Sequence, residues 1–262
     1  MHLKRLIIAF ILLPILYIYT MYLPAEYFLF LIVFFSTIAL SEFYTMFRIN
    51  GLLKYAGILC GGALLFVFFI ASEFFTDMLL FSALMLMGLR LFIKREAKAS
   101  LSETACAVFG LLYIPGLLTF QLSLDNTNPQ WIILLYASVW ASDSAALYIG
   151  SAIGKRKLYK EISPNKTVAG AVASVFGGVI GAVLIKMLMM HHISFSTMMI
   201  LGAAVGITTV IGDLVESMFK RDAEVKDSSN LVPGHGGVLD KLDGVLFAGP
   251  VFYWLCISLK LF

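Results

Sequence analysis

Long apolar runs alternate with short polar segments along the whole chain. A helix needs about 20 mostly apolar residues to cross a bilayer. Runs close to that length cover residues 6–23, 26–47, 52–71, 74–92, 104–121, 131–150, 168–190, 195–215 and 244–262. They are too long and too uniformly apolar to be the alternating strands of a membrane barrel. The pattern predicts an all-α, polytopic integral membrane protein with about nine transmembrane helices.

The composition excludes the soluble classes. The 262 residues are 60% hydrophobic and 13% charged, whereas soluble domains average about 45–50% apolar and about 25% charged residues. A disordered chain would be poor in apolar residues. A disulfide scaffold is excluded because each of the 3 cysteines lies inside an apolar run.

The basic residues predict the orientation in the membrane. If the N-terminus is cytoplasmic, the inner segments hold all 19 Lys and Arg residues except Lys186 and Lys260. Cytoplasmic loops are enriched in Lys and Arg, so we expect the N-terminus inside and the C-terminus outside. Lys4 and Arg5 precede the first run as in a signal peptide, but no small-residue cleavage pattern follows, and a retained helix is expected.

The chain is expected to be one integral-membrane domain, residues 1–262. We expect residues 1–137 to be membrane helices with little motif content, and residues 138–262 to be the half that carries the candidate chemistry. Glycines four residues apart within a run predict close helix packing. These pairs are Gly57 and Gly61, Gly177 and Gly181, and Gly202 and Gly206.

Two long cytoplasmic loops, 151–167 and 216–243, hold most of the reactive groups. The first has a net charge of +4, and its Lys155, Arg156 and Lys157 could equally be a topology anchor at anionic lipid heads. Its segment Ser163–Thr167 places hydroxyls and Lys166 just before a predicted helix. That arrangement suits a phosphate, although a Ser or Thr helix cap explains it as well.

The second loop, with the end of the preceding run, is rich in acids against the positive-inside trend. Between Gly212 and Gly244 the acids are Asp213, Glu216, Asp222, Glu224, Asp227, Asp240 and Asp243. On a helix, residues three or four apart share a face, which joins Asp213 with Glu216 and Asp240 with Asp243. Paired carboxylates suit a hard cation; the alternative is a set of solvated salt bridges.

Two further features point to ligand contacts. The turn Gly234-His235-Gly236-Gly237 lets a backbone approach a ligand closely, although a lone His is more often structural. Asp143 lies inside an apolar run, where a carboxylate is a functional candidate by default. The alternative for Asp143 is a hydrogen bond to a neighbouring serine on its own helix.

Together the two loops predict a metal-dependent enzyme that handles phosphates at the inner membrane surface. The basic loop suits phosphates, and Mg²⁺ bound to the acidic loop would offset its repulsion of them. A secondary transporter is disfavoured because the polar groups gather at one face and no repeated halves are visible.

The same loops carry a family resemblance. The segment Ser217–Arg221, then Lys226-Asp227, then Pro233–Asp243 resembles the signature of phosphatidate cytidylyltransferases, also called CDP-diacylglycerol synthases. Ser163–Thr167 and the run containing Asp143 are also similar, so the resemblance covers mainly residues 138–262. The chain departs from the family pattern at Ala169, Val232 and Lys241.

The resemblance implies that CTP and phosphatidic acid react to give CDP-diacylglycerol and pyrophosphate. A CTP-dependent lipid kinase and a cytidylyltransferase for another lipid phosphate are the alternatives. The implied cofactor is Mg²⁺, with or without a second monovalent or divalent cation. A homodimer in the inner (plasma) membrane is implied, with the active site facing the cytoplasm and no nucleic-acid partner.

The resemblance also implies roles for individual residues. The implied catalytic residues are Asp213, Asp240, Asp243, Lys220 and Asp143. The implied metal ligands are Asp213, Asp240, Asp243 and Asp227. The implied substrate-binding residues are Ser163, Lys166, Thr167, Lys220, Arg221, Lys226, His235, Gly236 and Gly237.

Overall fold

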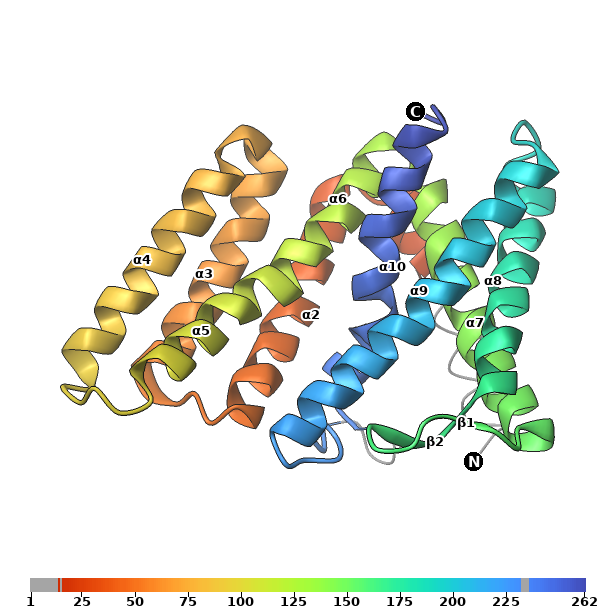
Figure 1. The fold of residues 1–262 in the computed structure, drawn as a ribbon. Helices are drawn as coiled ribbons and strands as arrows, with labels where there is room; N and C mark the ends of the chain where they lie inside the picture. Colours follow the sequence, from red (N-terminus) through yellow and green to blue (C-terminus); the bar gives the residue numbers. More distant parts are fainter. Residues whose placement is uncertain (1–13, 15, 232–235) are drawn as a thin grey trace. The chain divides into compact units, whose positions relative to one another are not determined.

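The computed structural model describes residues 14, 16–231 and 236–262, which are helical apart from one short ribbon and the connecting loops (Figure 1). In chain order the elements are α2 (Ala25–Met46), α3 (Gly51–Ile70), the 3-10 turn η1 (Ser72–Phe74), α4 (Phe75–Ile93), α5 (Ser100–Leu111), the π-helical turn η2 (Leu112–Gly116), α6 (Leu117–Thr127), α7 (Gln130–Ile153), β1 (Lys157–Tyr159), β2 (Ser163–Thr167), α8 (Val168–Leu188), α9 (Phe195–Asp222) and α10 (Leu239–Ser258).

Within the described residues, 7 helical segments are long and apolar enough to cross a membrane. They are Ala25–Met46, Gly51–Ile70, Ser72–Ile93, Ser100–Thr127, Gln130–Ile153, Val168–Leu188 and Phe195–Asp222. Each coincides with a predicted run, which confirms a multi-span helical membrane protein. The predicted run 6–23 lies largely outside the described residues, and run 244–262 falls on α10, which is not among the 7. The number nine therefore stays a prediction.

The chain forms two compact units. Unit 1 comprises Met1–Phe28, Ser123–Met218 and Asp243–Phe262, and unit 2 comprises Leu29–Leu122 and Phe219–Leu242. Helices α9 and α10 each contribute residues to both units.

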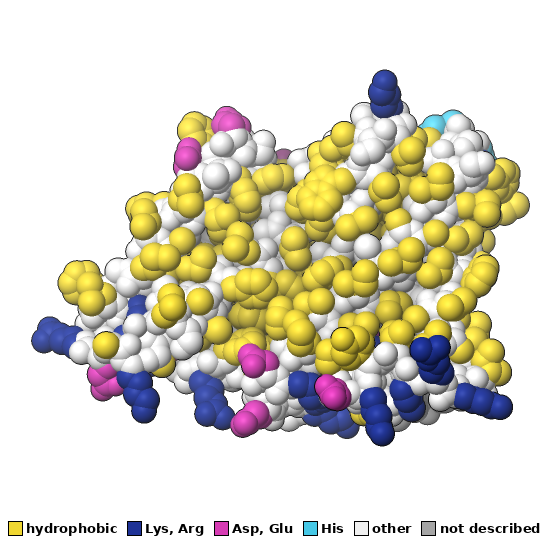
Figure 2. Space-filling view, in the orientation of Figure 1, with side chains coloured by type: hydrophobic (Ala, Val, Ile, Leu, Met, Phe, Trp, Pro, Cys, Tyr) yellow, Lys and Arg dark blue, Asp and Glu magenta, His cyan; other side chains and the backbone are white. Residues whose placement is uncertain are grey.

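Unit 1 packs α7, α8 and α9 through glycines, as predicted. A Cβ atom at Gly202 would lie 2.5 Å from the carbonyl oxygen of Gly178, and one at Gly181 would lie 2.8 Å from that of Ala137. Another face of α8 exposes the apolar side chains of Phe176 and Ile180. Figure 2 shows such apolar side chains covering the middle of the helices, as lipid contact requires.

Unit 2 packs α2 against α3 and α5. The Tyr44 ring fills the space left by Gly57, where an added Cβ would lie 2.7 Å from it. The Tyr44 hydroxyl donates to the carbonyl oxygen of Ala107 at 2.8 Å. Beside it, Phe43 contacts Tyr113 and also Phe219 at the end of α9. This aromatic cluster fixes the end of α9 against α2.

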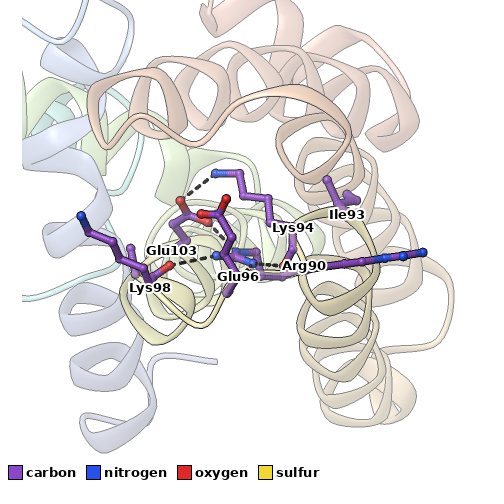
Figure 3. Close-up of a pocket in the computed structure, with 8 residues that line it drawn as sticks. Arg90, Ile93, Lys94, Glu96, Lys98 and Glu103 are labelled. Carbon is purple, nitrogen blue, oxygen red and sulfur yellow. Dashed lines mark hydrogen bonds and ion pairs between the residues drawn. The ribbon is translucent and has the colours of Figure 1, made fainter.

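A buried cation organises the turn between α4 and α5 in unit 2 (Figure 3). Arg90 is 3% exposed, pairs with Glu103 at 2.5 Å, and donates to the carbonyl oxygens of Lys94 and Lys98. Lys94 also pairs with Glu103, at 2.7 Å, while the Lys98 ammonium points away from the pocket in Figure 3. Arg90 and Lys94 thus converge on Glu103 and hold the turn together.

Both predicted loops contain more regular structure than expected. The first holds an antiparallel ribbon in which Lys157 pairs with Thr167 and Tyr159 with Ser163. In the second, α9 continues to Asp222 and α10 begins at Leu239, so both ends of the predicted loop are helical. The helix continues past its apolar run because residues 216–222 include good helix formers.

Candidate active site

Three carboxylates gather in unit 1. Asp213 and Glu216 lie one turn apart on α9, and Asp243 lies on α10. Each of the three residues has a carboxylate oxygen within 4.8 Å of those of the other two. Close contact of the two helices makes this possible: a Cβ atom at Gly212 would collide with the carbonyl oxygen of Asp243. Glu216 is fully buried, and the other two are half-buried.

This acid cluster (Asp213, Glu216 and Asp243) suits a hard cation. Two like charges about 4 Å apart repel by about 4 kcal/mol at an effective dielectric constant near 20. The negative charge of Asp143 on α7 also acts on Asp243, although the Asp143 side chain is itself exposed. Carboxylate oxygens are the ligands that Mg²⁺ and Ca²⁺ prefer, so the donor set fits the implied Mg²⁺.

A lysine of the β-ribbon reaches this cluster. The Lys166 Nζ lies 2.7 Å from Asp213 Oδ1. The next residue, Thr167, is the N-cap of α8. Its hydroxyl oxygen accepts from the Gly170 N–H at 3.1 Å, and its O–H donates to the Gly150 carbonyl oxygen at 3.4 Å. The structure therefore favours the helix-cap interpretation for Thr167 and leaves Lys166 as the phosphate candidate. Ser163 lies at the far end of the same strand.

Asp240, a predicted metal ligand, has a different environment in unit 2. Its Oδ1 accepts from Lys220 Nζ at 2.5 Å. Its Oδ2 accepts from the Ser228 N–H at 3.0 Å, the Ser228 hydroxyl at 2.7 Å and the Gly237 N–H at 2.7 Å. Burial raises the pKa of Asp240, but the hydrogen bonds from Lys220, Gly237 and Ser228 outweigh burial and lower it to about 2. The carboxylate is ionised and saturated with protein donors.

The glycines of the predicted turn approach these carboxylates. Gly236 has φ +83, and a Cβ atom there would lie 2.5 Å from Asp240 Oδ2. A Cβ atom at Gly237 would collide with the Ser228 hydroxyl and would lie 2.5 Å from Glu42 Oε2. The sequence predicted that the backbone here approaches a ligand closely. In the structure the backbone of Gly236 and Gly237 approaches the carboxylates of Asp240 and Glu42 instead.

The remaining predicted site residues follow Lys220 in the sequence. The Arg221 guanidinium donates to the Val225 carbonyl oxygen at 3.0 Å, and both Lys226 and Asp227 are exposed. Asp227 does not belong to the acid cluster among the described residues. His235 lies outside the described residues.

Sequence reasoning missed two residues. Glu216 was paired with Asp213 as a pair of acids that suits a cation, but it was not among the metal ligands that the resemblance implies. Glu42 on α2 was not singled out. It is an acid inside an apolar run, the same signal that selected Asp143.

Comparison with known proteins decides the family. The pattern that defines the Cytidylyltransferase family matches residues 3–259. The chain belongs to the cytidylyltransferase family. The match spans both halves of the chain, so the family character extends beyond the 138–262 region in which the sequence motifs lie.

Curated relatives within this family include phosphatidate cytidylyltransferases. The chain is 29% identical to that of Bacillus subtilis over 264 residues, covering 96% of this chain and 97% of the relative. It is 34% identical to that of Rickettsia felis over 213 residues, covering 78% and 92%. It is 40% identical to that of Haemophilus influenzae over 152 residues, covering 53% and 51%.

Proposed function

We propose that the chain transfers the cytidylyl group of CTP to phosphatidic acid. A phosphate oxygen of the lipid forms a bond to the α-phosphorus of CTP, and the bond from that phosphorus to the oxygen bridging the β-phosphate breaks. The products are CDP-diacylglycerol and pyrophosphate. The observation that carries this proposal is the acid cluster beside Lys166, in a chain of the cytidylyltransferase family.

The acid cluster would hold Mg²⁺. When bound, the ion supplies charge neutralisation and a template for the phosphates of two anionic reactants. The fit rests on three oxygen donors within 4.8 Å of one another.

The chain's own residues then position phosphates. Lys166 pairs with Asp213 in this structure, which places an ammonium beside the cluster for a phosphate to contact. No general base is required, because the attacking lipid phosphate is already ionised. Asp143 acts electrostatically on Asp243 and would tune the charge of the cluster. Arg221 and Lys226 are proposed to contact phosphates, and His235 to shape the nucleotide pocket.

The membrane arrangement is proposed with the function. Nine spans, with the N-terminus in the cytoplasm and the C-terminus outside, would place both loops on the side where CTP is found. Phosphatidic acid would reach the site from the inner (plasma) membrane, and we propose that the enzyme works as a homodimer. The asymmetry of Lys and Arg along the sequence supports this orientation.

The test is an assay of the purified protein in detergent with CTP, phosphatidic acid and Mg²⁺. Release of pyrophosphate with formation of a cytidine-containing lipid is the expected result. Release of CDP with a phosphorylated lipid would instead identify a kinase and overturn the proposal. Repeating the assay with other lipid phosphates in place of phosphatidic acid separates a cytidylyltransferase of different lipid specificity.

A further inference from the structure

We infer that Glu42 of α2 is a positioning residue for this reaction, one that holds the loop carrying Gly236 and Gly237 and the start of α10, which carries Asp240. The inference rests on the proposed function, because its principal readout is the use of CTP. It assigns a role to a helix of the first half of the chain, where the sequence shows little motif content.

The Glu42 carboxylate collects four donors from one loop of unit 2. Oε1 accepts from the Ser229 hydroxyl at 2.5 Å and the Val238 N–H at 3.0 Å. Oε2 accepts from the Leu239 N–H at 2.8 Å and the Ser228 hydroxyl at 3.3 Å. These donors lie 186 to 197 residues away in the chain. A single side chain thus holds both ends of the loop.

The partners explain why an acid stands in an apolar helix. Glu42 is 6% exposed, and no Lys or Arg forms an ion pair with it among the residues that the structure describes. A buried carboxylate is costly unless hydrogen bonds satisfy it. The N–H groups of Leu239, the first residue of α10, and of Val238 just before it lie at the helix N-terminus, where the helix dipole favours negative charge. Glu42 therefore caps α10 from another helix.

Glu42 and Asp240 act on the loop together. The Ser228 hydroxyl lies 2.7 Å from Asp240 Oδ2 and 3.3 Å from Glu42 Oε2, so the serine links the two carboxylates. Gly237 passes between them so closely that no side chain fits there. Loss of the Glu42 charge would release Ser229 and the start of α10, and through them the glycine turn.

The helix that carries Glu42 is itself fixed against α9. Phe43, the next residue, packs edge to face on Phe219, with ring centroids 6.4 Å apart at 82°. Phe219 precedes Lys220, which pairs with Asp240. The end of α2 therefore holds α9 through an aromatic contact and the loop through a carboxylate, within one unit.

The experiment compares Glu42→Gln with Glu26→Gln, the same change at an exposed position on the same helix. Both are assayed with varied CTP and saturating phosphatidic acid. For Glu42→Gln we expect the KM for CTP to rise about tenfold or more, since hydrogen bonds to a charged group are lost. Glu26→Gln should match the wild type, and Glu42→Asp, which keeps the charge, should recover part of the affinity for CTP.

A second readout does not depend on activity. Hydrogen exchange at the amides of Val238 and Leu239, followed by mass spectrometry, should be at least about tenfold faster in Glu42→Gln. If Glu42→Gln does not fold, Ser229→Ala is the second test, because it leaves the Glu42 carboxylate in place and removes one of its donors, the 2.5 Å contact, together with the local Leu231 N–H bond to the same hydroxyl at 3.2 Å. That variant should raise the KM for CTP about threefold.

The outcomes separate the two proposals. If the wild type is inactive but exchange at Val238 is fast in Glu42→Gln, the proposed function is contradicted, while the claim that Glu42 holds the loop is supported. An active wild type, with unchanged KM and unchanged exchange in Glu42→Gln, would overturn the positioning role. A fall in kcat alone, with KM and exchange unchanged and no recovery in Glu42→Asp, would mean that Glu42 only supports the fold.

Discussion

Two groups of buried and half-buried acids in this chain have opposite environments. In unit 1, the acid cluster brings three carboxylates within 4.8 Å of one another, with Lys166 paired to one of them. In unit 2, the carboxylates of Glu42 and Asp240 accept from seven described donor groups, of which the Ser228 hydroxyl is shared between them. The first group concentrates negative charge, whereas the second has its charge satisfied by the protein.

This contrast indicates two different roles for the acids of the sequence motif. Carboxylates that crowd together are stabilised by a cation and provide its ligands. Carboxylates saturated by N–H, hydroxyl and ammonium groups hold a loop in place. Asp240 and Asp243 lie three residues apart on α10, yet they belong to different groups. We therefore propose that Asp243 binds the metal and that Asp240 closes the loop.

The largest effect is expected at the acid cluster. Asp213→Asn and Asp243→Asn should each lower kcat by at least about a hundredfold, because charge neutralisation at the reacting phosphates depends on the bound ion. Pyrophosphate release in detergent measures this effect. Asp77→Asn, at an exposed position on α4, is the matched control. Near-normal turnover in either cluster variant would remove that residue from the metal site.

A smaller effect, on stability, is expected for Asp240→Asn. Lys220 is 8% exposed and would lose its carboxylate partner, which should cost about 2 kcal/mol and lower the thermal midpoint by about 5 °C. A fluorescence-detected melting curve in detergent measures the shift, and Asp222→Asn, which is exposed at the end of α9, serves as the control. A midpoint equal to that of the wild type would contradict the loop-closing role.

The glycine turn tests the same loop by steric means. Gly237→Ala would place a methyl group against Glu42 and Ser228, so the turn must shift. We expect the KM for CTP to rise about tenfold, with a smaller change in kcat, as is usual when substrate binding is lost. Gly88→Ala is the control, because nothing lies within 4 Å of a Cβ atom there. An unchanged KM would separate the turn from nucleotide binding.

The smallest effect concerns pH. The pKa of Asp240 is lowered to about 2, so its contribution to stability is complete above its unfolded pKa and is lost only as the pH falls toward 2. The difference in thermal midpoint between wild type and Asp240→Asn should therefore be equal at about pH 8 and about pH 5, and shrink below about pH 4. A difference that already narrows between about pH 8 and about pH 5 would mean that Asp240 is not held ionised.

Much of the fold was predictable because the bilayer imposes a length. Runs of about 20 apolar residues coincide with the seven apolar helical segments, and glycine pairs marked the close contacts of α8. The limits of the loops were not predictable from hydropathy. Residues 216–222 are mostly polar yet helical, because helix propensity and not hydrophobicity decides there.

The site was predictable where its residues are close in the sequence. Asp213 and Glu216 share a helix face, and the acidic excess marked the region. The contact of Lys166 with Asp213 and the binding of the loop by Glu42 join residues far apart in the chain. Such pairings arise from packing and leave no local signal. Asp240 and Asp243 appeared equivalent in the sequence for the same reason, since only the packing of the chain gives them different partners.

The most direct test of the different roles of Asp243 and Asp240 is a titration with Mn²⁺ in place of Mg²⁺. Binding is followed by electron paramagnetic resonance, without CTP or lipid. The wild type and Asp240→Asn should bind the ion with affinities within about twofold of each other, whereas Asp243→Asn should lose at least about tenfold in affinity. Loss of Mn²⁺ binding in Asp240→Asn, with normal binding in Asp243→Asn, would contradict the account.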